Sequence, residues 1–410
     1  MRTVVVDYET VEIQADGSLL ASTEAYRPNF RVTSCAYTEE INGALISWYT
    51  EGEDATRVEL RKLEADQSRI VAHNIQYEIL CTKCRFPEVS LNWYADSMRL
   101  SQVYDNGGDS SDFVLVLEED VLEPGDRPKV TRKPTEGFSL VKCTQRILGD
   151  TSDHKKEAHD YIKKLVPNVK PKSVGSYLHL LPSDVMERYN VADTETTYRL
   201  YKHCVDYFTY IGYDWSLDHR LFLSLLNPLV DSQIRGVRVN RVGLEADRKL
   251  VAAEIVLMGT AFRARFKAEI EAVEADRLEL FVSGKIKAKK PEAIQRTKDK
   301  RLARYKAGAE KALKAVQFNP GSNDQLAALF TGKLDISPVF FTDKGKPSFK
   351  SSMLHQWGEG GGMLQARRKR MLVLKQQESL LELSAFDGRW HLAIKLVGTA
   401  TGRLAGGSSQ

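Results

Sequence analysis

The stretch VVVDYET (residues 4–10) joins a short apolar run to two acidic residues. Three consecutive valines are typical of a strand that is buried on both faces, and we expect such a strand here. Alternation along an extended strand places Asp7 and Glu9 on the same face, with both carboxylates directed into one space. A divalent cation would relieve their repulsion, because Mg²⁺ prefers oxygen ligands. Taken alone, the pattern is also explained by a strand end whose acids lie in water.

The length and composition limit the class of protein. A chain of 410 residues is too long for one ordinary core and predicts two or three domains, and 42% apolar and 28% charged residues are typical of globular proteins. No apolar run approaches the ~18 residues of a membrane span, and Met1 leads into a strand without a signal-like segment. We therefore expect a cytoplasmic protein without a membrane partner.

The five cysteines are an odd number scattered along the chain, which indicates reduced thiols rather than a disulfide framework. Only Cys81 and Cys84 have a spacing that suits a metal. A zinc site would need a second pair or a nearby histidine couple, and neither is evident. We expect both thiols to be side chains of a helix over residues 77–84.

Positive charge is concentrated in one part of the chain. Residues 285–314 contain twelve basic and three acidic residues, a local net charge of +9, whereas the whole chain carries +4. A solvated helix face is the ordinary explanation of a charge run, but such faces usually mix signs for pairing. A run of one sign repels itself unless a polyanion is present, so the pattern favours nucleic acid as a partner.

The first two hundred residues alternate between strand-like and helix-like segments, which predicts an α/β fold. The expected strands cover residues 4–10, 32–37, 44–49 and 69–74, and the first expected helix covers residues 54–65. Residues 106–136 are polar and rich in Gly, Asp and Pro, and we interpret them as an insertion or mobile loop. Helical patterns dominate the rest of the chain.

Two further segments supply acids in helical contexts. AHNIQYE (residues 72–78) places Glu78 one turn into a helix that follows a buried strand. YNVAD (residues 189–193) places Tyr189 and Asp193 four residues apart, on one face of a helix. Three separated segments therefore offer an acid at an element end or on a helix face.

In this order the three segments resemble the exonuclease motifs of the proofreading domain in family A (Klenow-type) DNA polymerases. YADSMRLSQVY (residues 94–104) is similar to the segment that follows the second motif. NPLVDSQIRGVRVN (residues 227–240) resembles the start of that family's thumb, FNPGSNDQLAALF (residues 318–330) its path from thumb to palm, and TATGR (residues 399–403) its T-x-T-G-R motif. Together these segments extend over nearly the whole chain, and we expect a phage source.

The resemblance implies the domains. Residues 1–210 are expected to form an RNase H-like (DnaQ-like) 3′-5′ exonuclease domain that includes the insertion at residues 106–136. Residues 211–317 are expected to form a mostly helical thumb with a basic arm, and residues 318–410 a thumb-to-palm segment with an incomplete palm. Within the thumb we expect one long helix over residues 244–273 and a helical hairpin that turns near Ser283 and Gly284.

The resemblance also implies two-metal hydrolysis of phosphodiester bonds from DNA 3′ ends, with Mg²⁺ or Mn²⁺ ions about 4 Å apart. Asp7, Glu9 and Asp193 would hold one ion, and Asp7 with Glu78 the other. Tyr189 would orient the attacking water, because a phenol with a reference pKa of about 10 is a better hydrogen-bonding group than a base. The family most often has Asp where this chain has Glu78, which makes the position of the second ion less certain.

Contacts with DNA are expected at two places. Thr10 and Asn74 lie beside the metal motifs and could touch the terminal nucleotide, although Thr10 could simply continue the strand and Asn74 could cap the next helix. His73 is more simply explained as a structural side chain than as a ligand. The expected contacts with primer-template duplex are Lys298, Arg301, Arg304, Arg368 and Lys375 with phosphates, and Arg403 with the minor groove.

The family continues beyond the equivalent of Gln410 into the palm and fingers, and this chain contains no polymerase active site. We therefore expect DNA synthesis to require those parts, either in a longer chain or in a second, C-terminal palm and fingers polypeptide. The alternative function is a non-catalytic DNA-binding or assembly subunit of a split DNA polymerase, in which Glu78 marks a degraded site.

Overall fold

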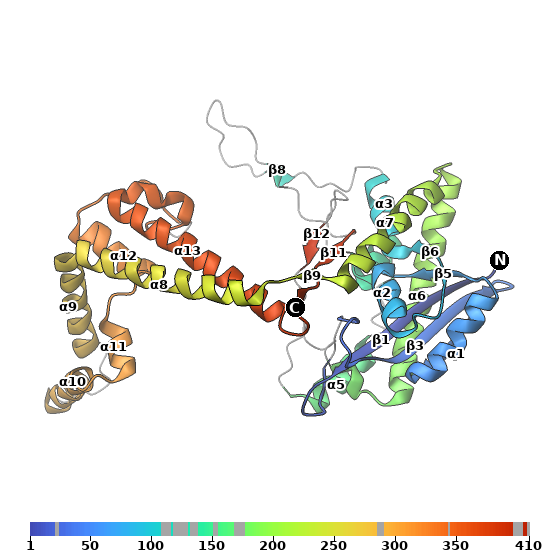
Figure 1. Ribbon diagram of the computed structural model, residues 1–410, viewed down its shortest axis with the longest axis horizontal. Coiled ribbons are helices and arrows are strands. Elements are labelled where there is room, and N and C mark those ends of the chain that lie inside the picture. The colour runs from blue at the N-terminus through green and yellow to red at the C-terminus, as the bar shows by residue number, and fades with distance from the viewer. Residues whose placement is uncertain are drawn as a thin grey trace. The chain divides into compact units, whose positions relative to one another are not determined.

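The chain forms two units in the computed structural model (Figure 1). The first comprises Met1–Val237 and His391–Gln410, and the second comprises Arg238–Trp390. The structure describes residues 1–20, 24–107, 116–117, 130–131, 138–150, 155–167, 177–284, 291–342, 345–396 and 405–407. In this part of the chain, no helix is both long and apolar enough to cross a lipid bilayer.

Unit 1 is built on a mixed sheet with the strand order β4-β3-β1-β5-β6. The strands are β1 (Thr3–Ile13), β2 (Leu19–Leu20), β3 (Phe30–Ile41), β4 (Ala44–Glu51), β5 (Arg69–Ala72) and β6 (Asn92–Asp96). β5 is parallel to both β1 and β6, β3 is antiparallel to β1 and β4, and β2 pairs with β1. The expected strands are confirmed, and β1 is the central one.

Strand β1 is buried on both faces because its valines alternate between two cores. Val4 and Val6 pack in one core, and Val5 packs in the other. By the same alternation Asp7 and Glu9 follow Val5, on the second face. The pattern of VVVDYET therefore fixes the face of the sheet to which the acids belong.

Helices cover both faces of this sheet. They are α1 (Gly52–Ala65), α2 (Ile75–Arg85), α3 (Ser97–Gly107), α4 (Leu140–Ile147), α5 (Lys156–Leu165), α6 (Ser183–Tyr210) and α7 (Trp215–Arg235). Apolar side chains of α1, α2 and α7 share the core of Val4 and Val6, whereas α3, α4 and α6 share the core of Val5. Cys81 and Cys84 are free thiols of α2 that pack with the first core, as the structural interpretation predicted.

Unit 2 is mostly helical. Its elements are α8 (Arg241–Arg265), α9 (Lys267–Ser283), α10 (Pro291–Lys306), α11 (Glu310–Val316), α12 (Asn323–Ala327), a π-helical turn (Ala328–Lys333), a 3₁₀-helix (Ser351–Trp357) and α13 (Gly358–Leu383). α8 and α13 lie side by side (Figure 1). A Cβ at Gly361 would lie 1.9 Å from the carbonyl oxygen of Leu354, so a glycine is required where α13 begins.

The expected single helix over residues 244–273 is wrong. α8 ends at Arg265 and α9 begins at Lys267, and Phe266 between them has a non-helical ψ of 39°. Phe262, Phe266 and Ile270 all pack into the same core, and a bend at Phe266 lets both helices reach it. The expected hairpin of α9 and α10 is present, with α9 ending at Ser283.

The unit boundaries differ from the expected divisions after residues 210 and 317. α7 belongs to unit 1 because Phe222, Leu226 and Val230 pack in the core of the sheet. Residues 318–390 fall in unit 2, where Phe318 and Phe330 share a core with α8 and α9. Most of residues 106–136 lie outside the described part of the chain. Two short strands among them are described, and β7 (Val116–Leu117) pairs with β8 (Val130–Thr131).

The chain returns to unit 1 at His391. The imidazole of His391 lies 2.7 Å from the carbonyl oxygen of Gln233 in α7 and stacks on Tyr26 at a ring-centroid distance of 4.0 Å. β11 (Ala393–Lys395) pairs antiparallel with β12 (Ala405–Gly407). Gln76 of α2 donates a hydrogen bond of 2.6 Å to the carbonyl oxygen of Ile394, which joins this hairpin to the helix that carries Glu78.

Candidate active site

A β-bulge lies beside Asp7 and Glu9, which are in the middle of β1 and not at a strand end, because the strand continues to Ile13. Glu9 pairs with Ser34 of β3, but Thr10 pairs with Val32, so Thr33 is an extra residue on β3. A bulge of this kind bends the strand and redirects the neighbouring side chains. The hydroxyl of Thr33 donates a hydrogen bond of 3.0 Å to the backbone carbonyl of Glu9, which fixes the bulge against β1.

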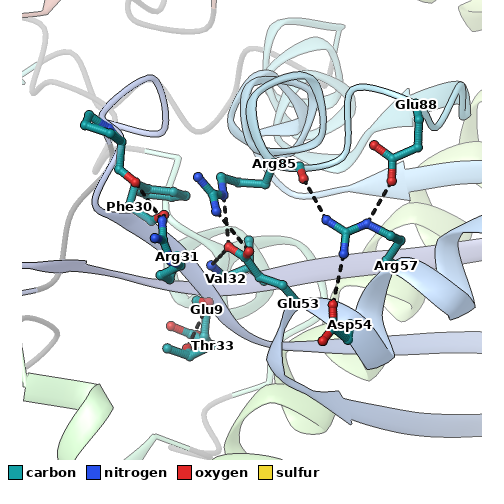
Figure 2. A network of polar contacts seen from close by, with 11 residues as sticks. Glu9, Phe30, Arg31, Val32, Thr33, Glu53, Asp54, Arg57, Arg85 and Glu88 are labelled. Carbon is teal, nitrogen blue, oxygen red and sulfur yellow. Dashed lines mark hydrogen bonds and ion pairs between the residues drawn. The ribbon is translucent and has the colours of Figure 1, made fainter.

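Figure 2 shows how helices hold the same bulge from the other side. Glu53, in the first turn of α1, accepts the backbone N–H of Val32 at 3.1 Å. Arg85, in the last turn of α2, donates two hydrogen bonds of 2.9 Å to the same carboxylate. This bidentate pair fixes both helices relative to β3, so the backbone around Glu9 is held by three elements.

Helix α6 presents the second part of the site. Tyr189 and Asp193 are one turn apart and both are buried, with Tyr189 packed between Ala158 of α5 and Met186. Burial, Asp193, Glu9 and Asp7 all raise the pKa of the Tyr189 phenol, in that order of influence. A raised pKa favours the hydroxyl form of Tyr189, which can donate a hydrogen bond.

Glu78 lies in the first turn of α2 and is 2% exposed. Its Oε2 atom is buried without a hydrogen-bond partner in the described part of the chain. Burial is the largest cause that raises its pKa well above the usual range, and Asp7 follows. A buried carboxyl oxygen without a partner is rare enough in proteins to indicate that something else binds it.

The remaining carboxyls repel one another. Burial, followed by the charge of Asp193, raises the pKa of Asp7 to about 7, while Lys155 lowers it. Burial, followed by Asp7 and Asp193, raises the pKa of Glu9 well above its usual range. The four acids of β1, α2 and α6 therefore act on each other electrostatically although they come from distant parts of the sequence.

The chemistry of this donor set fits a divalent cation. Several carboxyls share one region of high negative charge, and the oxygen of Glu78 lacks a partner. As the side chains stand, no three His, Cys, Asp or Glu residues in the described ranges come together as a group that could hold a metal ion. Binding an ion would require the side chains to draw closer by adopting other rotamers.

Two residues at this site were not predicted. The ammonium of Lys155 donates hydrogen bonds to Asp193 Oδ2 at 2.7 Å and to Tyr189 Oη at 3.1 Å. Asp96, at the end of β6, accepts the backbone N–H groups of Asn74 at 3.0 Å and Met98 at 2.9 Å. An acid between a strand and a helix was a recognisable capping signal, whereas nothing in the local sequence singled out Lys155.

The neighbouring residues have structural partners. Thr10 is hydrogen bonded to the hydroxyl of Tyr77. Asn74 occupies the N-cap position of α2 with a left-handed φ of 69°, but its side chain makes no capping bond. The two ring nitrogens of His73 contact Ser97 Oγ at 2.8 Å and the carbonyl of Phe138 at 2.9 Å, in agreement with a structural histidine.

The basic residues expected to contact duplex differ in their surroundings. In α10, Arg301 donates to the carbonyls of Phe281 at 3.1 Å and Gly284 at 2.9 Å, at the end of α9. Arg368 donates to the carbonyl of Phe349. Exposed or half-exposed side chains that pair with no other described residue are Lys298, Arg304 and Lys375. Arg403 lies outside the described residues.

No family model matches this chain, but it is similar to a curated protein and to solved structures. The chain is 26% identical over 243 residues to a DNA polymerase of Bacillus phage SP01, covering 56% of this chain and 25% of that protein. The POL domain of Pol1 from M. smegmatis, solved in complex with DNA primer-template and dNTP, matches with a TM-score of 0.51 and 17% identity. That match covers 99% of this chain and 51% of the Pol1 chain, so our chain spans about half or less of each relative. The chain is therefore distantly similar in sequence to a DNA polymerase over about half its length, and similar in fold to the Pol1 POL domain over nearly its whole length.

Proposed function

We propose that this chain is the 3′-5′ proofreading exonuclease and DNA-binding part of a family A DNA polymerase. Unit 1 would be an RNase H-like exonuclease domain, and unit 2 the thumb. The observation that carries the proposal is the electrostatic coupling of four acids and Tyr189 on β1, α2 and α6, although three separate segments supply them. A purely structural role would not require so many mutually repelling carboxyls in one place.

In the proposed site, Asp7, Glu9 and Asp193 would hold one Mg²⁺ or Mn²⁺ ion, and Asp7 with Glu78 a second. Such ions would activate a water molecule and stabilise the leaving 3′-oxygen of an in-line displacement. Tyr189 would orient that water through its hydroxyl, which stays protonated because burial and the nearby acids raise its pKa. The acids would act as ligands and not as proton carriers.

Unit 2 would hold the DNA through phosphate contacts. None of the residues of α10 is buried, and its basic side chains outnumber its acidic ones. Lys298 and Arg304 pair with no other described residue, so both are free to neutralise phosphate. Binding of this kind is independent of sequence and sensitive to salt. DNA synthesis would require a palm and fingers, supplied by a longer chain or by a second polypeptide.

The second candidate function is a non-catalytic DNA-binding or assembly subunit of a split polymerase. The observation that favours it is that no three potential ligands in the described part of the chain are arranged to hold a metal. In that case the acids would be remnants of a catalytic site, and unit 2 would supply the remaining function.

One experiment separates the two functions. A 5′-labelled single-stranded oligonucleotide is incubated with the chain and Mg²⁺ or Mn²⁺, alongside the variant Asp7→Ala and a reaction with EDTA. The exonuclease produces a ladder that shortens from the 3′ end and disappears in both controls. Absence of shortening by a folded chain that still binds the oligonucleotide would support the non-catalytic subunit.

A further inference from the structure

Lys155 occupies an unusual place for a lysine. It directly precedes α5, and its side chain is only 20% exposed. A positive charge near a helix N-terminus is opposed by the helix dipole, and burial of an ammonium also costs free energy. The next residue, Lys156, lies at the same helix end but is exposed, so it does not meet the cost of burial. The position of the Lys155 ammonium therefore depends on the groups that surround it.

Those groups are the acids of the proposed exonuclease site. Lys155 Nζ lies 2.7 Å from Asp193 Oδ2 and 3.1 Å from Tyr189 Oη, and 5.0 Å from the centre of the Tyr189 ring. Its charge also acts on Asp7 and Glu9 of β1. The same ammonium thus faces three of the four acids that would hold metal.

Packing holds Lys155 in this position. α5 lies against α6, and Ala158, one turn after Lys155, packs on Met186 and Tyr189. The backbone of Lys155 is therefore fixed relative to α6, and its side chain reaches Asp193 and Tyr189 together. An ion pair between two flexible surface side chains would lack this constraint.

We propose that Lys155 is a built-in competing cation that sets the affinity of the site for divalent metal and positions Tyr189. This inference rests on the proposed exonuclease function. Without metal, the ammonium neutralises part of the acid cluster and holds Asp193. A divalent ion can engage Asp193 fully only by displacing that hydrogen bond, so Lys155 weakens metal binding. The hydroxyl of Tyr189 remains within reach of the ammonium and keeps its orientation.

Competition and a structural role predict opposite results. If Lys155 competes, the variant Lys155→Met binds metal more tightly, because the acids lose their counter-charge. If Lys155 only supports the fold, the same variant binds metal more weakly, because Asp193 becomes misplaced. Lys155→Arg keeps the charge, and Lys156→Met removes a neighbouring lysine that is exposed.

The test is titration of the full-length chain with Mn²⁺ by isothermal calorimetry, for the parent and the three variants. We expect Lys155→Met to bind Mn²⁺ about tenfold more tightly, the scale of a close charge pair, while Lys155→Arg and Lys156→Met stay near the parent. Lys155→Met is also expected to melt at a lower temperature than the parent without metal and to recover with Mn²⁺. Its exonuclease turnover should fall, because Tyr189 loses its partner.

Unchanged or weaker Mn²⁺ binding by a folded Lys155→Met variant would overturn the inference. That result would leave the exonuclease proposal intact as long as the parent binds Mn²⁺ and shortens DNA. If the parent neither binds Mn²⁺ nor shortens DNA, both proposals fail together. Tighter binding with reduced turnover is the combination that the competing cation predicts.

Discussion

The middle of β1 and helix α10 each carry like charges at close spacing, but these charges lie in different surroundings. The acids of β1 feel the charge of further acids on α2 and α6, and burial raises the pKa values of Asp7 and Glu9. The bases of α10 lie on a helix without a buried residue. Asp7 and Glu9 are half-buried, and like charges withdrawn from water in this way need a counter-ion, whereas exposed ones are satisfied by water until a polyanion arrives. The first arrangement suits chemistry and the second suits binding.

The largest expected effect tests the acid cluster. Asp7→Asn keeps the shape of the side chain but removes a charge that both proposed ions share, so exonuclease activity should fall about a thousandfold or more. Binding of duplex DNA should stay unchanged, because that function is assigned to unit 2. Gel-based degradation and fluorescence anisotropy measure the two effects. If Asp7→Asn loses exonuclease activity and duplex binding together, the assignment of these two functions to separate units is wrong.

The next effect tests α10. Replacing Lys298 and Arg304 by Ala removes two exposed charges, and the slope of log affinity against log salt should decrease in magnitude by about two. Exonuclease activity on short single strands should not change. The control is Lys62→Ala in α1, an exposed lysine of unit 1 that pairs with Glu59 at 2.8 Å. An unchanged salt slope in the double variant would exclude these two residues as phosphate contacts.

The third prediction concerns how the free energy of unfolding depends on pH, which tests the surroundings of the β1 acids. Burial, and then Asp193, raise the pKa of Asp7 from 3.8 to about 7, and burial raises that of Asp96 to about 6. Between the ordinary pKa of Asp7, 3.8, and its raised value of about 7, the folded state binds more protons than the unfolded state. The free energy of unfolding therefore falls as pH rises from about 4 to about 7.

The fall should amount to roughly 4 kcal/mol from Asp7 alone in EDTA, and it should become smaller in Asp7→Asn. Saturating Mn²⁺ should also reduce the dependence of the free energy of unfolding on pH, because a bound cation stabilises the ionised form of Asp7. Urea unfolding at a series of pH values measures this free energy. A stability that rises through this pH window in EDTA would contradict the crowding of acids around Asp7.

The smallest effect concerns Arg301, which the sequence grouped with the DNA contacts. Because its guanidinium binds the last carbonyls of α9, Arg301→Ala should destabilise unit 2 by about 1 kcal/mol. Arg304→Ala, which removes a side chain without such a partner, should leave the stability unchanged. Thermal melting of both variants measures the difference, and equal melting temperatures would show that the contacts of Arg301 contribute nothing.

The elements of the acid cluster were predictable because they depend on short-range periodicity. A strand places Asp7 and Glu9 on one face, and a helix places Tyr189 and Asp193 on one face, whatever the rest of the chain does. The break at Phe266 was not predictable in this way, because the apolar pattern continues through it. The assignment of α7 to unit 1 was not predictable either, because it depends on which core the apolar face of α7 packs against, and that core belongs to the sheet.

The sequence by itself determined the strand of VVVDYET, the faces of its acids, the order of the polymerase-like motifs and the concentration of positive charge. Only the tertiary structure decided that Lys155, just before α5, reaches Asp193, that Arg301 binds the end of α9, and that the chain returns to unit 1 at His391. The reason is physical: a local pattern sets where a side chain points on its own element. Which groups it meets depends on packing between segments that are distant in the sequence.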